Sequence, residues 1–197
     1  MDFYLMRHSQ TDFNELGYYQ GCLLNPPLND YGVKQTLKLV DKVAELRVDK
    51  VYSSPLRRAY GTAKLLFPWL TNHNLYIRSD LIEGDFGIIE GMREVDIREK
   101  YPEDFAKWKD LDNIWFNFPN GQSKGEIGCR MYNALYNIHQ TSLLSNRVFI
   151  VTHSASIRCL LLNMGIKEEN IPFGTLYHIK TDGTARYPLQ FVERIVL

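Results

Sequence analysis

Short β-forming segments alternate with helical segments along most of the chain, and this alternation constrains the fold more than any other feature. Residues 3–6 form an apolar run that is followed at once by polar residues, as expected where a buried parallel strand passes into a loop. The same reasoning predicts strands at residues 3–6, 50–53, 75–77, 147–152, 173–181 and 191–196. Strands that alternate with helices form a mainly parallel sheet covered on both faces. We therefore expect a three-layer α/β/α sandwich with a mainly parallel central sheet.

Helical segments are indicated between these strands by apolar spacing and by capping residues. Asn29 is a candidate N-cap for one helix whose apolar positions are Val33, Leu37, Val40 and Ala44. Further helices are predicted from Pro55 through residue 67, from the capping box of Ser123 and Glu126 onward, and over residues 155–164 with Gly165 at the end.

The segment from about residue 87 to residue 123 interrupts the alternation. It is rich in aromatic and charged side chains, and we interpret it as a short helical lid insertion over one end of the sheet. Its aromatic residues have two interpretations: packing of the lid onto the domain, and stacking on a base or sugar. Packing is the more common role. No repeat or linker is visible, so residues 1–197 are predicted to form one domain that carries this lid.

Composition narrows the partners and the compartment. Basic and acidic side chains balance at 23 each, so no overall positive charge attracts nucleic acid or an anionic membrane. The three cysteines are far apart and predict neither a disulfide framework nor a zinc site. We expect a cytoplasmic protein without nucleic-acid or membrane partners, and a homodimer is compatible with the sequence. Binding of an anion then requires a local cluster of cations.

Such a cluster is indicated at the ends of three predicted strands. The first strand ends in Arg7-His8, the second is followed by Ser53-Ser54 and the pair Arg57-Arg58, and the late strand ends in Thr152-His153-Ser154. Ligands of open parallel sheets bind at the carboxyl ends of the strands. If these strands are neighbours, two histidines and two arginines converge on one edge of the sheet, where they suit a phosphate group. Each dipeptide alone is uninformative, and it is their joint occurrence that favours a site.

These segments also carry a resemblance to a known family. The chain resembles the histidine phosphatase superfamily, the phosphoglycerate-mutase-like proteins, and is most similar to the small phosphatases that include α-ribazole-phosphate phosphatase. The resemblance runs in order through residues 7–14, 20–21, 27–29, 53–59, 81–87, 90–91, 119–123 and 151–158, and the stretch 100–108 supports the small-phosphatase branch.

The resemblance implies a role for each matching residue. His8 is implied to be the nucleophile that becomes a phosphohistidine, and Glu83 the proton donor to the leaving group. The implied phosphate pocket consists of Arg7, Arg58 and His153. Asn14 and Gln20 are implied contacts to phosphate or substrate. No metal and no organic cofactor are implied.

The sequence departs from the family pattern at four positions. Ser9 and Ser154 stand where glycine commonly follows each of the two histidines, Pro55 stands where aspartate is common, and Gly61 where glutamine is common. We expect the two serine hydroxyls either to narrow the phosphate pocket or to donate to the phosphate. Both serines therefore belong to the expected binding site.

The sequence therefore predicts a metal-independent phosphomonoesterase that hydrolyses a small organic phosphate, with a sugar- or nucleotide-like alcohol part. A phosphoglycerate mutase is the alternative within the family, disfavoured because those enzymes tend to be longer. A non-catalytic phosphate-binding module is a third hypothesis, disfavoured because none of the core residues is lost.

Overall fold

The computed structural model describes residues 1–70, 75–142, 146–181 and 189–197, and its six strands form one sheet in the order β3-β2-β4-β1-β5-β6. The strands are β1 (Asp2–Arg7), β2 (Lys50–Ser53), β3 (Leu75–Ile77), β4 (Arg147–Thr152), β5 (Thr175–Thr181) and β6 (Leu189–Val196). The first four strands of this order run parallel, β5 is antiparallel to β1, and β6 is antiparallel to β5. The predicted mainly parallel sheet is confirmed.

The central strands β1 and β4 bury side chains on both faces, which explains their nearly continuous apolar sequences. Side chains alternate along a strand, so Phe3 and Leu5 point into one hydrophobic cluster while Tyr4 and Met6 point into another. The strand thereby serves two cores at once. Any shift of one residue in the β1 register would exchange the two sets of side chains.

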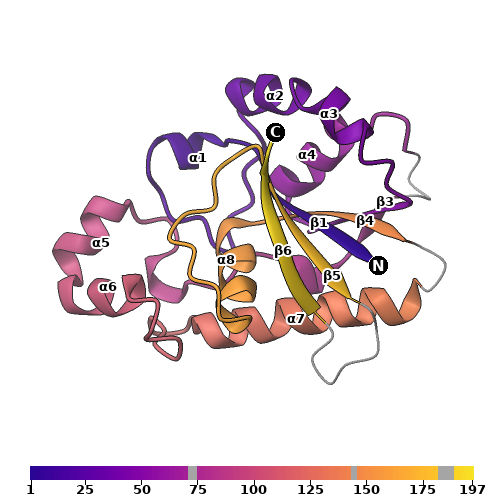
Figure 1. Ribbon diagram of the computed structural model, residues 1–197. Helices are drawn as coiled ribbons and strands as arrows, with labels where there is room; N and C mark the ends of the chain where they lie inside the picture. Colours follow the sequence, from indigo (N-terminus) through magenta and orange to yellow (C-terminus); the bar gives the residue numbers. More distant parts are fainter. Residues whose placement is uncertain (71–74, 143–145, 182–188) are drawn as a thin grey trace.

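Helices cover both faces of the sheet, as Figure 1 shows. On one face lie α2 (Asp30–Leu37), α3 (Val40–Ala44) and α4 (Arg57–Leu66); on the other lie α7 (Lys124–Thr141) and α8 (Ser154–Asn163). The α4 side chains pack with Tyr4 and Met6, and those of α7 and α8 with Phe3 and Leu5. This is the predicted three-layer α/β/α sandwich.

The prediction of one continuous helix after Asn29 is wrong. The chain forms α2 and then α3, separated at residues 38–39, where Leu39 adopts the N-cap position without a side-chain hydrogen bond. The break changes which side chains face the core. Leu39 and Val43 are buried, whereas Leu37, assigned to the apolar face, is 52% exposed.

The lid segment contains a 3-10 helix, η2 (Gly87–Ile89), and two short helices, α5 (Glu94–Lys100) and α6 (Pro102–Lys109), which lie at the left of Figure 1. Trp108 and Phe118 are buried and pack in one cluster with Ile127 of α7 and Cys159 of α8. These two aromatics therefore pack the lid onto the domain. Trp115, by contrast, is 66% exposed.

Two further short helices lie beside the edge where the parallel strands end: α1 (Asp12–Glu15) and the 3-10 helix η1 (Ser79–Leu81). Within the described residues, no helix has both the length and the apolar character needed to cross a membrane. Cys22, Cys129 and Cys159 are free thiols.

Candidate active site

Three neighbouring strands bring the predicted site residues to one edge of the sheet. β4 lies between β1 and β2, with Arg7 opposite Thr152 and Ser53 opposite Val151. A cavity of about 250 Å³ opens at this edge. Its lining residues are Arg7, His8, Asn14, Gly17, Tyr18, Tyr19, Gln20, Gly21, Arg58, Glu83, Phe86, Glu94, Lys109, Ser154, Ala155, Arg158 and Asn170. The convergence predicted from the strand ends is thus present.

His8 is 3% exposed and lies in the cavity wall directly after β1. Its Nδ1 lies 2.7 Å from the carbonyl oxygen of Ser9. Because a carbonyl only accepts, Nδ1 carries the proton and Nε2 of the neutral ring keeps its lone pair. Burial, and then the positive charges of Arg58 and Arg7, hold the pKa of His8 well below its usual value. The ring is therefore neutral at neutral pH.

His153 lies next to His8, with a distance of 5.2 Å between the ring centroids. The side chain is fully buried and is not itself in the cavity wall. Its Nε2 is 2.7 Å from the Oγ of Ser54, and its Nδ1 has no partner among the described residues. Burial and the nearby charge of Arg58 lower the pKa of His153 well below its usual value. Within the described residues, Nδ1 is therefore the ring atom without a hydrogen-bond partner.

Arg7 is held from two directions. Its Nη1 donates to the carbonyl oxygen of Ile171 at 3.0 Å, and the ring of Phe173 lies 4.0 Å from its guanidinium carbon. Burial lowers the pKa of Arg7 to about 10, which leaves the group charged at neutral pH. An aromatic face stabilises such a cation without neutralising it. Arg7 therefore keeps its charge for an anion in the cavity.

Arg58 is 1% exposed, whereas its neighbour Arg57 is exposed and lies outside the cavity wall. The two terminal nitrogens of Arg58 donate to the carbonyl oxygens of Leu24 and Gly21 at 2.8 and 2.7 Å. Burial lowers its pKa to about 10, so it also remains charged. Fixed backbone partners set the orientation of the guanidinium before any ligand arrives.

Glu83 is 6% exposed and accepts hydrogen bonds from the N-terminus of α8. Its Oε1 receives the amides of Gly84 and Ser156 at 3.0 Å each, whereas the Ser156 hydroxyl, 3.1 Å away, donates to the carbonyl oxygen of Ile82 at 2.8 Å. Its Oε2 receives only the amide of Ala155, at 3.2 Å. Oε2 is therefore the oxygen with room for a proton. From α7, Arg130 donates to the carbonyl oxygens of this segment, including that of Glu83.

Asn14 and Gln20 both line the cavity and are both oriented by Thr11. The Asn14 side-chain oxygen accepts from the Thr11 amide at 3.1 Å as part of the capping box of α1, and the Gln20 oxygen lies 3.1 Å from the Thr11 hydroxyl. Neither side-chain nitrogen has a partner within the part of the chain that the structure describes. Both are positioned as N–H donors at the cavity.

The two serines that replace glycine occupy different environments. Ser154 lines the cavity, whereas Ser9 is fully buried outside the lining. The Ser9 hydroxyl accepts from Thr36 at 2.7 Å, and its amide donates to Thr62 at 3.0 Å. Neither serine has a positive φ, so neither position requires glycine for its backbone conformation. The Ser9 carbonyl accepts the hydrogen bond from His8, and the Ser9 hydroxyl is hydrogen-bonded to Thr36 instead of facing the cavity.

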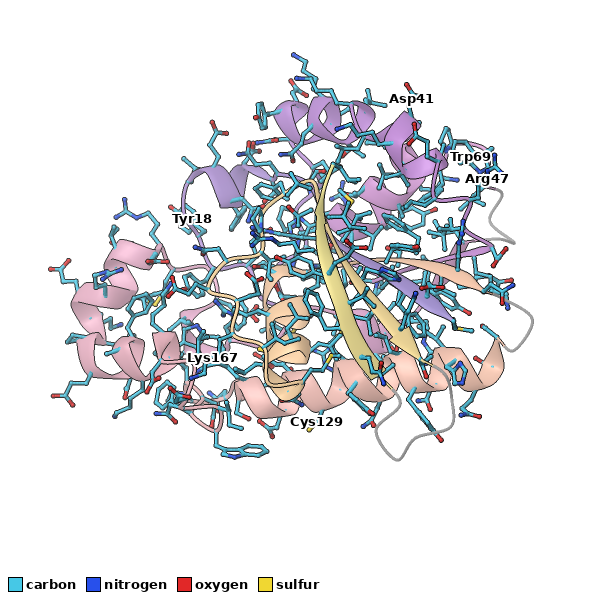
Figure 2. All side chains as sticks on the ribbon, in the orientation of Figure 1. Tyr18, Asp41, Arg47, Trp69, Cys129 and Lys167 are labelled. Atoms are coloured by element: carbon cyan, nitrogen blue, oxygen red, sulfur yellow. The ribbon has the colours of Figure 1, made fainter. Side chains whose placement is uncertain are left out.

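The cavity wall contains charged and aromatic residues that the sequence reasoning missed. Tyr18 and Tyr19 come from the loop after α1, and Figure 2 shows Tyr18 on the side of the molecule that carries α1 and α5. Glu94 and Lys109 come from the lid, where nothing in the sequence indicates which side chains face inward. Arg158 had a usable signal, because it follows the cavity residue Ser154 by one helical turn.

The cavity wall itself offers no group of metal ligands among the described residues. The one cluster of suitable side chains in the described part of the chain consists of Cys22, Asp85 and Glu90. Glu90 accepts from the backbone amides of Cys22, Leu23 and Phe86, and burial raises the pKa of the Cys22 thiol to about 11. These groups stabilise the loop, and a protonated thiol is a poor metal ligand.

Comparison with known proteins agrees with this arrangement. The family model of the histidine phosphatase superfamily (branch 1) matches residues 3–191. Phosphoserine phosphatase 1 of Hydrogenobacter thermophilus is 32% identical over 167 residues, which cover 83% of this chain and 77% of the relative. A 2,3-bisphosphoglycerate-dependent phosphoglycerate mutase of Bartonella quintana is 29% identical over 178 residues, which cover 85% of this chain and 83% of the relative.

The fold also matches solved structures. The α-ribazole phosphatase from Shigella flexneri superposes with a TM-score of 0.76 at 21% identity, covering 98% of this chain and 95% of that one. The family model matches residues 3–191, and the fold agrees with it. The chain therefore belongs to the histidine phosphatase superfamily.

Proposed function

We propose that this chain is a phosphomonoesterase that hydrolyses a small organic phosphate through a phosphohistidine on His8. The observation that carries the proposal is the fixed tautomer of His8 between two charged arginines. Nδ1 is tied to the Ser9 carbonyl, so Nε2 is the nucleophilic atom, and Arg7 and Arg58 remain charged in the same wall. A neutral nucleophile beside fixed cations suits attack on a phosphate ester.

In the first half of the reaction, the Nε2 lone pair of His8 forms a bond to phosphorus while the bond to the ester oxygen breaks. Arg7 and Arg58 neutralise charge on the equatorial oxygens, a task that falls to side chains when no metal takes part. The Nδ1 of His153 and the side-chain nitrogens of Asn14 and Gln20 add N–H donors to the phosphate oxygens. Ser154, in the same wall, is placed to donate its hydroxyl.

The leaving alkoxide receives its proton from Glu83. Oε2 is assigned as the proton-bearing oxygen because it accepts a single hydrogen bond of 3.2 Å, whereas Oε1 accepts two of 3.0 Å. A bound phosphate favours the protonated carboxyl through like-charge repulsion. In the second half, the resulting carboxylate takes a proton from water, and the water oxygen attacks phosphorus and releases His8.

Hydrolysis of p-nitrophenyl phosphate in the presence of a chelator tests this proposal. The wild-type chain should turn over, and His8→Ala should not. Arg58→Met should lose most activity, while Arg57→Met, which removes the exposed neighbour, serves as the matched control. A phosphoryl group that is stable in base and labile in acid should be trapped on the wild-type chain alone. Turnover by His8→Ala at the wild-type rate would refute the nucleophile, and inactivity of every form would favour the non-catalytic phosphate-binding module.

The mutase remains a second candidate because the Bartonella quintana relative carries that name. A mutase protects its phosphohistidine from water and returns the phosphoryl group to a second hydroxyl. Incubation with 3-phosphoglycerate and its bisphosphate primer separates the two activities: a phosphatase releases inorganic phosphate, and a mutase produces 2-phosphoglycerate.

The identity of the alcohol is approached through size and through relatives. The cavity has a volume of about 250 Å³, which accommodates an alcohol of a few carbon atoms. Phosphoserine is a reasonable first compound in a substrate panel, because the Hydrogenobacter thermophilus relative is a phosphoserine phosphatase. A cytoplasmic location completes the proposal; the three free thiols support it, and cell fractionation tests it.

A further inference from the structure

A second cavity lies beside α2 and α3, apart from the active site. Its volume is about 670 Å³, which is larger than that of the active-site cavity and of a size common for ligand sites in proteins. The wall consists of side chains of α2 and α3 together with residues 173, 174 and 197. Figure 1 shows the C-terminus beside these two helices. The two cavities have no lining residue in common.

Three lysines line this second cavity, and among the described residues no acidic side chain does. Lys34, Lys38 and Lys42 are exposed and follow one another at intervals of four residues along α2 and α3. Within the part of the chain that the structure describes, no carboxylate lies within ion-pair distance of any of the three. Like charges around one cavity repel one another and raise the local concentration of anions. The wall therefore favours a ligand with at least one negative charge.

Apolar side chains form much of the remaining wall. Leu37 and Tyr31 line the cavity although they are 52% and 61% exposed. Leu39 and Leu197 also line it. Large apolar side chains that stay exposed around a cavity mark ligand-binding surfaces. An inorganic anion would leave these side chains in contact with water, and a neutral apolar molecule would leave the lysines without a counter-charge. The wall therefore fits an organic anion whose body is apolar or aromatic.

Phe173 links the second cavity to the active site. Its ring lines the second cavity and lies 4.0 Å from the guanidinium carbon of Arg7, which lines the first. The centroid of the same ring is 6.5 Å from that of His8. From α2, the side-chain oxygen of Gln35 accepts the backbone amide of Gln10 at 3.3 Å. A ligand in the second cavity would therefore contact the ring that supports Arg7 without entering the active-site cavity.

We propose that the cavity beside α2 and α3 is a second binding site, which takes a small organic anion with an apolar or aromatic body. The acidic group of the ligand lies among Lys34, Lys38 and Lys42, and its body packs against Leu37 and Phe173. This site goes beyond the proposed phosphatase function and does not depend on it, because the ligand is bound outside the active-site cavity and is not hydrolysed there.

A matched pair of fluorescent probes tests the site. 8-Anilinonaphthalene-1-sulfonate and N-phenyl-1-naphthylamine have the same ring system, and only the first carries a negative charge. In fluorescence titrations of the wild-type chain, the Kd of the sulfonate should be at least about tenfold lower than that of the uncharged probe, since three lysines contribute. Saturating inorganic phosphate should not compete with the sulfonate, and Arg58→Met, which alters the active site, should bind it as the wild type does.

Single substitutions then locate the probe. Lys34→Met and Lys38→Met should each raise the Kd of the sulfonate by about twofold to fivefold and leave that of the uncharged probe unchanged. Lys34→Arg keeps the charge and should bind as the wild type does. Leu37→Gln should weaken both probes. Lys100→Met and Val95→Gln change an exposed lysine and an exposed apolar residue outside this cavity, and they should leave both Kd values unchanged. Urea unfolding verifies that each variant is folded.

Four results would overturn the proposal. Equal Kd values for the two probes, or a sulfonate Kd that survives both lysine substitutions, would show that the lysines bind no anion. Competition by phosphate would place the probe in the active site. Cosedimentation with phosphatidylserine vesicles that is lost in Lys34→Met and Lys38→Met would assign this surface to a membrane instead of a small molecule. A wild-type dimer that Leu37→Gln converts to a monomer in analytical ultracentrifugation would assign it to a second copy of the chain.

Discussion

Acidification should destabilise the folded chain because His8 and His153 are buried as neutral rings. Burial and nearby arginines hold both pKa values well below 6.5 in the folded state, while the unfolded chain binds protons near pH 6.5. The unfolded state then carries more protons, so the free energy of unfolding rises with pH in this window and falls as pH drops below 6.5. Between pH 6 and pH 5, each ring should remove about 1 kcal/mol of stability, and the pair about 2 kcal/mol.

Urea unfolding followed by tryptophan fluorescence at pH 7, 6 and 5, at constant ionic strength, measures this effect. His8→Asn and His153→Asn should each remove about half of the loss between pH 6 and pH 5, whatever the stability of the variant at pH 7. Carboxyl groups that titrate below this range are common to all forms and cancel in the comparison. An equal loss in the wild type and in both variants would show that the rings are protonated in the folded state, and would refute the neutral nucleophile.

Further predictions concern four single substitutions. Glu83→Gln should slow hydrolysis of alkyl phosphates by about 100-fold or more, and that of p-nitrophenyl phosphate far less, because an activated leaving group needs no proton; equal losses in a rate comparison would contradict the assigned role. Phe173→Leu removes the ring over Arg7, and the inhibition constant for inorganic phosphate should rise by about tenfold, the effect of losing a desolvated cation–π contact of about 1–2 kcal/mol. Ser9→Gly should lower the free energy of unfolding by about 1–2 kcal/mol in urea titrations through the lost buried hydrogen bond and backbone entropy. It should leave phosphate inhibition nearly unchanged, whereas Ser154→Gly should weaken phosphate inhibition with little change in stability.

The layers of the fold were predictable because strand burial leaves a plain pattern in the sequence. Residues 3–6 and 148–151 are apolar on both faces, which distinguishes central parallel strands from exposed ones. The break between α2 and α3 was not predictable from apolar spacing. Leu37 and Leu39 are equally apolar, and only packing against the sheet decides that Leu39 is buried and Leu37 exposed.

The inner part of the site was predictable for a different reason. His8 and His153 lie directly after strand ends, and Arg58 lies in the first turn of the helix that follows β2, so their positions follow from the sheet. Lys109 comes from a lid whose orientation depends on tertiary packing, and no local pattern marks it. Ser9 differs in the opposite direction. The sequence places its hydroxyl next to His8, but in the structure this hydroxyl contacts Thr36.

The place of β1 in the sheet has a consequence for how the chain assembles during synthesis. β1 is made first, yet its two neighbours are β4 and β5, which lie some 140 or more residues later. This apolar strand therefore remains without its sheet neighbours until some 140 further residues have been synthesised. Sheets with such distant strand pairings fold slowly and pass through intermediates whose exposed apolar surface makes them prone to aggregate. Chains cut short before β4 should aggregate or require a chaperone, and catalytic activity should appear only at the last stage of folding.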